Sequence, residues 1–143
     1  MPAQKREPRR ILIVDDEPTI VEFVDRALRR AGYETATAEG GPEAVATAAT
    51  SAPFDLVVAD VNMPELSGPD MVSRLRKQQP DLPVLYLTGF NDQLFAAKNI
   101  LWEGEAFLDK PATVDGLLQA VSLMLYGNIG GDTAAAKEKV RRR

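Results

Sequence analysis

The sequence contains no cysteine and no histidine among its 143 residues. Without cysteine it can form no disulfide and no thiolate nucleophile, and without either residue type it cannot build a Cys/His zinc site. Without histidine there is no Ser-His-Asp triad, and no imidazole that could act as a base or carry a phosphoryl group. Any chemistry must therefore use carboxylates, amines, hydroxyls, backbone amides or a hard metal ion bound through oxygen.

Long apolar runs are also absent. No stretch approaches the roughly 20 residues of a membrane span, and the first ten residues lack the apolar centre of a signal peptide. A cytoplasmic location is the default expectation for such a chain. The hydrophobic content of 45% is ordinary, and the length predicts one domain with a substantial core.

The net charge of −4 is unevenly distributed along the chain. Residues 1–10 hold four basic groups and one acid, and residues 127–143 hold five basic groups and two acids, so each end carries +3. Residues 11–126 therefore carry −10. An acidic body with short basic ends argues against a nucleic-acid-binding core, and no nucleic-acid partner is expected.

Short apolar runs rich in β-branched residues alternate with amphipathic segments. Strands are predicted at 11–14, 33–38, 54–59, 83–87 and 106–108, and helices at 18–31, 42–52, 69–78, 92–102 and 113–126. Five such alternations predict an α/β fold, a doubly wound parallel sheet with helices on both faces. We expect a basic extension at 1–8, one domain at 9–126 and a flexible or weakly helical basic tail at 127–143, too short for a second domain.

Polar side chains follow four of the five predicted strands. In chain order they are Asp15 and Asp16, Asp60, Thr88, and Asp109 with Lys110. Ligands of an open α/β sheet bind outside the carboxyl ends of the strands, so these groups are expected at one edge. If the first strand lies between the second and the third, Asp15, Asp16 and Asp60 are close neighbours.

Crowded carboxylates raise one another's pKa unless a cation lies between them. Mg²⁺ suits a few carboxylates at an open sheet edge, because it prefers oxygen ligands and retains several waters. Together with the amine of Lys110 and the hydroxyl of Thr88, this set meets the needs of phosphoryl transfer, which are placement and charge neutralisation. A carboxylate held there can be the nucleophile and give an aspartyl phosphate.

Four segments in this order and spacing carry a specific resemblance: ILIVDDEP (11–18), DLVVADVNMPELSGPDM (55–71), VLYLTG (84–89) and FLDKP (107–111). They resemble the response-regulator receiver domain of two-component phosphorelay signalling, over about residues 9–126. The resemblance implies a flavodoxin-like (βα)5 fold with strand order 2-1-3-4-5.

The resemblance also assigns the acceptor site. Asp60 matches the phosphoacceptor of a Mg²⁺-dependent reaction. Asp15 and Asp16 match the acidic pair that binds the metal with Asp60, and Asn62 matches the position that gives the metal a backbone carbonyl. Gly68 matches the turn that shapes the loop after the acceptor.

The phosphoryl-binding and switch positions follow from the same resemblance. Thr88 and Lys110 match the pair that binds the phosphoryl group. Thr88 and Phe107 match the switch that changes a surface formed by the fourth predicted helix (92–102), the fifth strand (106–108) and the last helix (113–126), which is named the α4-β5-α5 face. Asn62 and Phe90 match positions that tune hydrolysis of the aspartyl phosphate.

The absence of histidine makes the chain dependent on a partner. The resemblance implies a phosphohistidine as the donor, and because this sequence has no histidine, that phosphohistidine must lie on another protein, a histidine kinase or a histidine phosphotransfer protein. The last helix is apolar around more than one face, which favours a homodimer or a downstream protein partner at the α4-β5-α5 face.

Four other functions are alternatives to a phosphoacceptor switch. A degenerate pseudo-receiver would be a protein-interaction module only, and a receiver piece of a hybrid histidine kinase would work inside a longer protein. A small Mg²⁺ phosphatase would want a second carboxylate at position 62, where the chain has asparagine. A flavodoxin-type flavin carrier would share the fold but needs a phosphate loop after the first strand. No enzymatic activity is expected beyond the chain's own phosphorylation and dephosphorylation.

Overall fold

The computed structural model describes residues 8–89, 104–110 and 112–127. The helix predicted at 92–102, the hydrolysis-tuning position Phe90 and most of the basic tail lie outside these residues. Among the described helices, none combines the length and the apolar character needed to cross a membrane.

Five parallel strands form one sheet in the order β2-β1-β3-β4-β5. The strands are β1 (Arg10–Val14), β2 (Glu34–Ala38), β3 (Leu56–Asp60), β4 (Val84–Thr88) and β5 (Glu105–Asp109). This order confirms the doubly wound, flavodoxin-like prediction. It places β1 and β3 side by side in the middle of the sheet, so the chain reverses its direction of winding between them.

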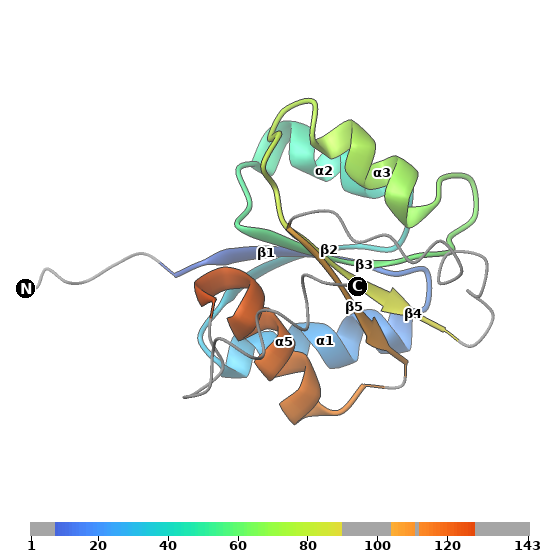
Figure 1. Cartoon of the computed structure of the whole chain (residues 1–143). Helices are drawn as coiled ribbons and strands as arrows, with labels where there is room; N and C mark the ends of the chain where they lie inside the picture. Colours follow the sequence, from blue (N-terminus) through green and yellow to red (C-terminus); the bar gives the residue numbers. More distant parts are fainter. Residues whose placement is uncertain (1–7, 90–103, 111, 128–143) are drawn as a thin grey trace, which may run out of the picture.

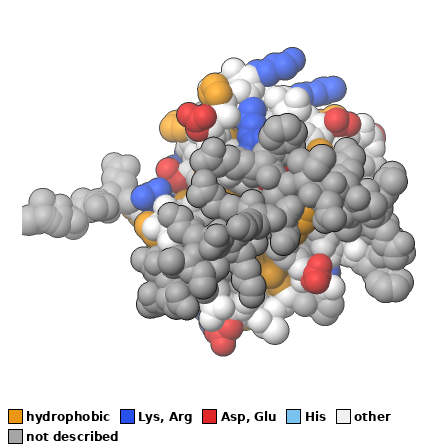
Figure 2. All heavy atoms as spheres, in the orientation of Figure 1, with side chains coloured by type: hydrophobic (Ala, Val, Ile, Leu, Met, Phe, Trp, Pro, Cys, Tyr) orange, Lys and Arg blue, Asp and Glu red, His pale blue; other side chains and the backbone are white. Residues whose placement is uncertain are grey.

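Four described helices cover the two faces of the sheet: α1 (Pro18–Arg30), α2 (Gly41–Ser51), α3 (Gly68–Leu75) and α5 (Val114–Tyr126). In Figure 1, α2 and α3 lie on one face, and α1 and α5 lie on the other. In Figure 2, Lys and Arg side chains of the described residues project at the top, over the α2/α3 layer, and acidic side chains are visible at several places around the rim.

The two helical layers explain why the central strands are apolar throughout. Along β1, Leu12 and Val14 belong to the core under α2 and α3, whereas Ile11 and Ile13 belong to the core under α1 and α5. All four side chains are completely buried. A strand covered on both faces needs apolar residues at every position, which produces the continuous runs seen in the sequence.

Two predicted boundaries are wrong by two or three residues, and a side-chain contact explains the later start of the strand. The helix predicted at 69–78 ends at Leu75, and the strand predicted from Phe54 begins at Leu56. The Gln79 side-chain amide accepts a hydrogen bond from the Phe54 backbone N–H (2.8 Å) and donates one to its carbonyl (2.9 Å). Both backbone groups of Phe54 are thus satisfied by a side chain rather than by a neighbouring strand.

Candidate functional site

Two buried aspartates lie at the carboxyl ends of the two central strands. Asp15 directly follows β1 and Asp60 is the last residue of β3. Because Val14 of β1 pairs with Ala59 of β3, the residues after them reach the same edge of the sheet at the same level. Asp15 is 0% exposed and Asp60 is 5% exposed. A buried carboxylate requires a partner, since water cannot solvate its charge.

Lys110 provides the positive charge between these two acids. Its Nζ lies 3.1 Å from Asp15 Oδ2 and 3.2 Å from Asp60 Oδ1, and the more exposed Glu17 Oε1 lies 3.6 Å away. Lys110 directly follows β5, and its backbone N–H donates to the Thr88 carbonyl at the end of β4 (2.8 Å). This bond continues the β4–β5 pairing and fixes the position from which the lysine reaches the two acids.

The three charged groups shift one another's pKa. Burial, and after it the charge of Asp15, raise the pKa of Asp60 to about 7 against the opposing effect of Lys110. Burial also raises the pKa of Asp15, although the Glu17 backbone N–H and Lys110 oppose this. Burial alone would lower the pKa of Lys110, but its contacts with Asp15 and Asp60 outweigh this and raise it. One ammonium group therefore does not fully compensate the two buried acids.

The donor set fits a hard divalent cation. One carboxylate oxygen from each of Asp15, Asp16 and Asp60 lies within 4.8 Å of the others. Oδ2 of Asp15 is buried and makes no hydrogen bond, although Lys110 Nζ lies 3.1 Å from it. Three carboxylates at an open edge, two of them buried, match the preference of Mg²⁺ for oxygen ligands.

Asp15, Asp16 and Glu17 make different contacts at the start of α1. Glu17 is the N-cap residue of α1, and its side chain makes no capping hydrogen bond. Asp15 Oδ1 accepts a hydrogen bond from the Glu17 backbone N–H (2.9 Å), which orients this buried carboxylate. Asp16 is therefore not the N-cap residue of α1.

Gly68 positions the loop that follows the acceptor strand. Its N–H donates to the Val61 carbonyl (2.8 Å), and a Cβ at this position would lie 2.2 Å from the Asp60 carbonyl oxygen. Only glycine permits so close an approach. The first turn of α3 is thus packed directly against the backbone of Asp60, which agrees with the turn role expected for Gly68.

Three further predicted positions, Thr88, Phe107 and Asn62, lie within the described residues. Thr88 ends β4, and its hydroxyl donates to Asp109 Oδ1 (3.0 Å). Phe107 is half-buried, and its ring centroid lies 5.8 Å from that of Tyr86 at an interplanar angle of 59°. Asn62 is exposed, two residues beyond Asp60.

The comparisons with known proteins agree with this geometry. The family model described as the response regulator receiver domain matches residues 11–122. The chain belongs to this family. It is thus a receiver domain of two-component signalling, as the resemblance implied.

Several relatives show how much of other proteins the receiver corresponds to. The chain is 35% identical over 119 residues to the probable transcriptional regulatory protein TcrX of Mycobacterium tuberculosis, covering 83% of this chain and 50% of the relative. It is 36% identical over 103 residues to the alkaline phosphatase synthesis transcriptional regulatory protein PhoP of Bacillus subtilis, covering 72% of this chain and 42% of the relative. The chain thus spans about half the length of these relatives.

Solved structures give the same fold. The chemotaxis response regulator CheY4 of Vibrio cholerae is 33% identical with a TM-score of 0.72, over 82% of this chain and 99% of that one. The receiver domain of the hybrid histidine kinase CckA is 31% identical with a TM-score of 0.69, over 81% and 98%.

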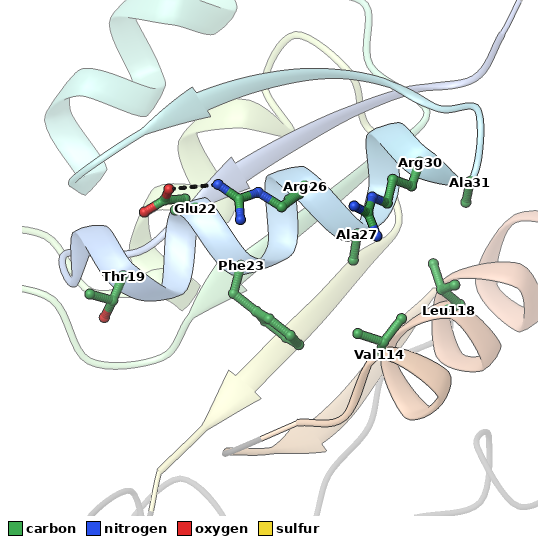
Figure 3. A pocket seen from close by; sticks show the side chains of 9 residues that line it. All are labelled: Thr19, Glu22, Phe23, Arg26, Ala27, Arg30, Ala31, Val114 and Leu118. Carbon is green, nitrogen blue, oxygen red and sulfur yellow. Dashed lines mark hydrogen bonds and ion pairs between the residues drawn. The ribbon is translucent and has the colours of Figure 1, made fainter.

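A groove of about 450 Å³ lies between α1 and α5 of the receiver (Figure 3). Phe23 and Ala27 of α1 and Val114 and Leu118 of α5 form its apolar lining. Its remaining lining residues are Thr19, Glu22, Arg26, Arg30 and Ala31. Its lining includes Thr19 in the first turn of α1 and Val114 at the start of α5.

Asp109 was missed as a specific partner of Thr88. The sequence placed it only among the polar residues that end the strands. The signal that could have found it is the parallel register, in which Thr88 of β4 pairs with Asp109 of β5. Side chains of directly paired residues lie on the same face of a sheet, within reach of a hydrogen bond.

Proposed function

We propose that Asp60 is the phosphoacceptor of this receiver, in a Mg²⁺-dependent transfer from a phosphohistidine of a histidine kinase or histidine phosphotransfer protein. The observation that carries the proposal is the contact of Lys110 Nζ with both Asp15 and Asp60, at 3.1 and 3.2 Å, at the open edge of the sheet. This arrangement holds a carboxylate nucleophile beside a fixed positive charge, as phosphoryl transfer requires.

In the transfer, a carboxylate oxygen of Asp60 attacks the phosphorus in line with the partner's imidazole nitrogen. The new P–O bond forms as the P–N bond breaks, and the electron pair of that bond leaves on the nitrogen. Lys110 neutralises charge on the phosphoryl oxygens, and Thr88 donates a hydrogen bond to one of them. Mg²⁺, held by Asp15, Asp16, Asp60 and the Asn62 backbone carbonyl, would supply further charge neutralisation when bound.

The output of the switch is proposed to follow from the movement of Thr88. When its hydroxyl turns to the phosphoryl group, the space it leaves lets Phe107 reorient, and this biases the α4-β5-α5 face between two states. The half-buried position of Phe107 supports the proposal, since a ring at the boundary of the core can change its exposure without a cavity forming inside.

The groove between α1 and α5 is the proposed docking place of the histidine-bearing partner. It has an apolar strip rimmed by Arg26 and Arg30, and its lining begins at Thr19 in the first turn of α1 (Figure 3). A partner helix with an apolar face and acidic flanks would fit this lining. Its contact at the start of the groove would bring a histidine toward Asp60.

The test is labelling with a small phosphodonor such as acetyl phosphate, with and without Mg²⁺. We expect the wild-type protein to be labelled with Mg²⁺ and not after chelation, and Asp60→Asn to remain unlabelled. Asp55→Asn is the matched control, because Asp55 immediately precedes the other end of the same strand. Equal labelling of Asp60→Asn would overturn the proposal, and no labelling of the wild type would favour the pseudo-receiver.

Three further parts of the proposal have their own measurements. A homodimer or a downstream protein at the α4-β5-α5 face predicts a change of mass in solution, or of partner binding, on adding a phosphoryl mimic.

Hydrolysis tuning by Asn62 and Phe90 predicts altered dephosphorylation rates when either residue is replaced by alanine. A cytoplasmic location remains a prediction, tested by fractionation of cells.

A further inference from the structure

The two groups that would bind the phosphoryl group are both engaged by carboxylates in this structure. Lys110 contacts Asp15 and Asp60, and the Thr88 hydroxyl donates to Asp109 Oδ1 over 3.0 Å. A threonine hydroxyl has a single hydrogen and can donate it to one acceptor at a time. Thr88 must therefore release Asp109 before it can donate to a phosphoryl oxygen on Asp60.

The backbone holds Thr88 and Asp109 together. The two residues pair directly in the parallel β4–β5 ladder, and the next N–H, that of Lys110, donates to the Thr88 carbonyl (2.8 Å). The hydrogen bond between the side chains thus forms without any rearrangement of the strands. Asp109 is exposed, so its carboxylate can also be released to water at little cost.

We propose that Asp109 is a positioning residue that holds the Thr88 hydroxyl in the unphosphorylated receiver and opposes its capture by the phosphoryl group. The inference rests on the proposed function, because it presumes that Thr88 serves a phosphoryl group on Asp60. Asp109 thereby affects how readily the Thr88 hydroxyl turns to the phosphoryl group. On β5 and just beyond it, two adjacent residues then have opposite effects, since Lys110 favours the phosphorylated state and Asp109 favours the unphosphorylated one.

The expected size of the effect follows from an exposed hydrogen bond to a charged acceptor. Removing the competing bond is expected to increase the affinity for a phosphoryl mimic about 2- to 10-fold. The Asp109 carboxylate could also act through its charge alone, by repelling an anion bound nearby. A replacement of Asp109 by itself cannot separate these two causes, but the Thr88 hydroxyl can be removed independently.

The experiment is a double-mutant cycle with beryllofluoride as the phosphoryl mimic, in the presence of Mg²⁺ and followed by amide NMR titration of the full chain. The proteins are wild type, Asp109→Ala, Thr88→Ala and the double variant, with Asp115→Ala as a control that removes another exposed carboxylate nearby in the sequence. We expect Asp109→Ala to bind the mimic about 2- to 10-fold more tightly, and to give no gain when Thr88 is replaced by alanine. Asp115→Ala is expected to bind like the wild type.

The outcomes separate this inference from the proposed function. An equal gain with and without the Thr88 hydroxyl would assign the effect to charge and overturn the positioning role, as would no gain or a loss in Asp109→Ala. A wild-type protein that does not bind the mimic, or an Asp60→Asn variant that binds equally well, contradicts both the proposed function and this inference. Binding by the wild type with no change in Asp109→Ala contradicts this inference alone.

A second readout needs no phosphoryl mimic. Three-bond couplings to the Thr88 methyl group report the population of its side-chain rotamers. In the unphosphorylated protein we expect one dominant rotamer in the wild type and in Asp115→Ala, and a mixture in Asp109→Ala. The same rotamer population in all three proteins would show that Asp109 does not hold the hydroxyl.

Discussion

Buried charges occur at both ends of the sheet, and the two clusters are built differently. At the amino end, Arg76 Nη1 donates to Glu105 Oε2 (3.0 Å), and its Nε and Nη2 both donate to the Leu82 carbonyl (3.0 and 2.7 Å). At the carboxyl end, Lys110 lies between Asp15 and Asp60, and a buried oxygen of Asp15 makes no hydrogen bond. The first cluster balances one anion with one cation, whereas the second has more acids than bases.

This difference distinguishes a structural pair from a candidate site. A buried ion pair is tolerated when its charges balance and its remaining polar groups are bonded, as in the Arg76–Glu105 pair. An excess of buried acid costs stability and persists where a function requires it. The excess negative charge at the carboxyl edge is what a bound divalent cation would relieve.

The largest predicted effect comes from unbalancing the amino end. Arg76→Leu leaves the Glu105 carboxylate, 8% exposed, buried without its partner. We expect the free energy of unfolding to fall by about 3 kcal/mol, measured by urea denaturation. Arg74→Leu is the control, because Arg74 is exposed on the same helix.

A double replacement sharpens this prediction. In Arg76→Leu with Glu105→Leu both charges are gone, and much of the lost stability should return, because apolar pairs often replace buried ion pairs without loss. If Arg76→Leu were no less stable than Arg74→Leu, the amino-end pair would not be a balanced structural element, and the comparison would fail.

The second prediction concerns the carboxyl end of the sheet, where removing a charged group is expected to raise the free energy of unfolding rather than lower it. Burial raises the pKa of Asp60 from 3.8 to about 7, so the folded state resists ionising a group that the unfolded state ionises readily. The folded protein therefore loses stability as pH rises from about 4 to about 7, and the loss is complete above the folded pKa. Without divalent cations, Asp60→Asn should raise the free energy of unfolding by about 2 kcal/mol at pH 8 and by less at pH 5.

The matched control is again Asp55→Asn. The Asp55 carboxylate accepts a hydrogen bond from the Arg10 backbone N–H (2.7 Å), so its loss should leave stability unchanged or lower at both pH values. A destabilised Asp60→Asn at pH 8, or a gain independent of pH, would show that the carboxyl end is balanced in the same way as the amino end.

The sequence predicted the parts of the molecule that depend on local pattern. The apolar runs before Asp15 and Asp60 require burial on both faces, and this alone indicates central strands of a parallel sheet. The strand order followed from the resemblance, and the structure confirms it. Because the carboxyl ends of parallel strands meet at one edge, the meeting of Asp15, Asp60 and Lys110 could also be predicted.

The remaining features depend on contacts between residues distant in the chain. The Gln79 amide sets where β3 begins, and Arg76 reaches Glu105 across 29 positions. Neither side chain has a periodic pattern that would reveal its partner. The Thr88–Asp109 bond requires the exact β4–β5 register, which a shift of one residue would abolish.

The smallest predicted effect is the response of stability to Mg²⁺, and it tests whether the two clusters are independent. A cation that binds only the folded state stabilises it by mass action, by about 1.4 kcal/mol at a concentration tenfold above its dissociation constant. We expect this increase in the wild type and, because the two ends of the sheet share no partner, also in Arg76→Leu.

The Asp60→Asn variant should lose most of this increase, since a carboxamide is a weaker ligand than a carboxylate. Thermal unfolding with MgCl₂ against KCl at equal ionic strength measures the difference, which removes general screening as a cause. If Arg76→Leu lost the response, or Asp60→Asn kept it in full, the contrast between a balanced amino end and a cation-requiring carboxyl end would not hold.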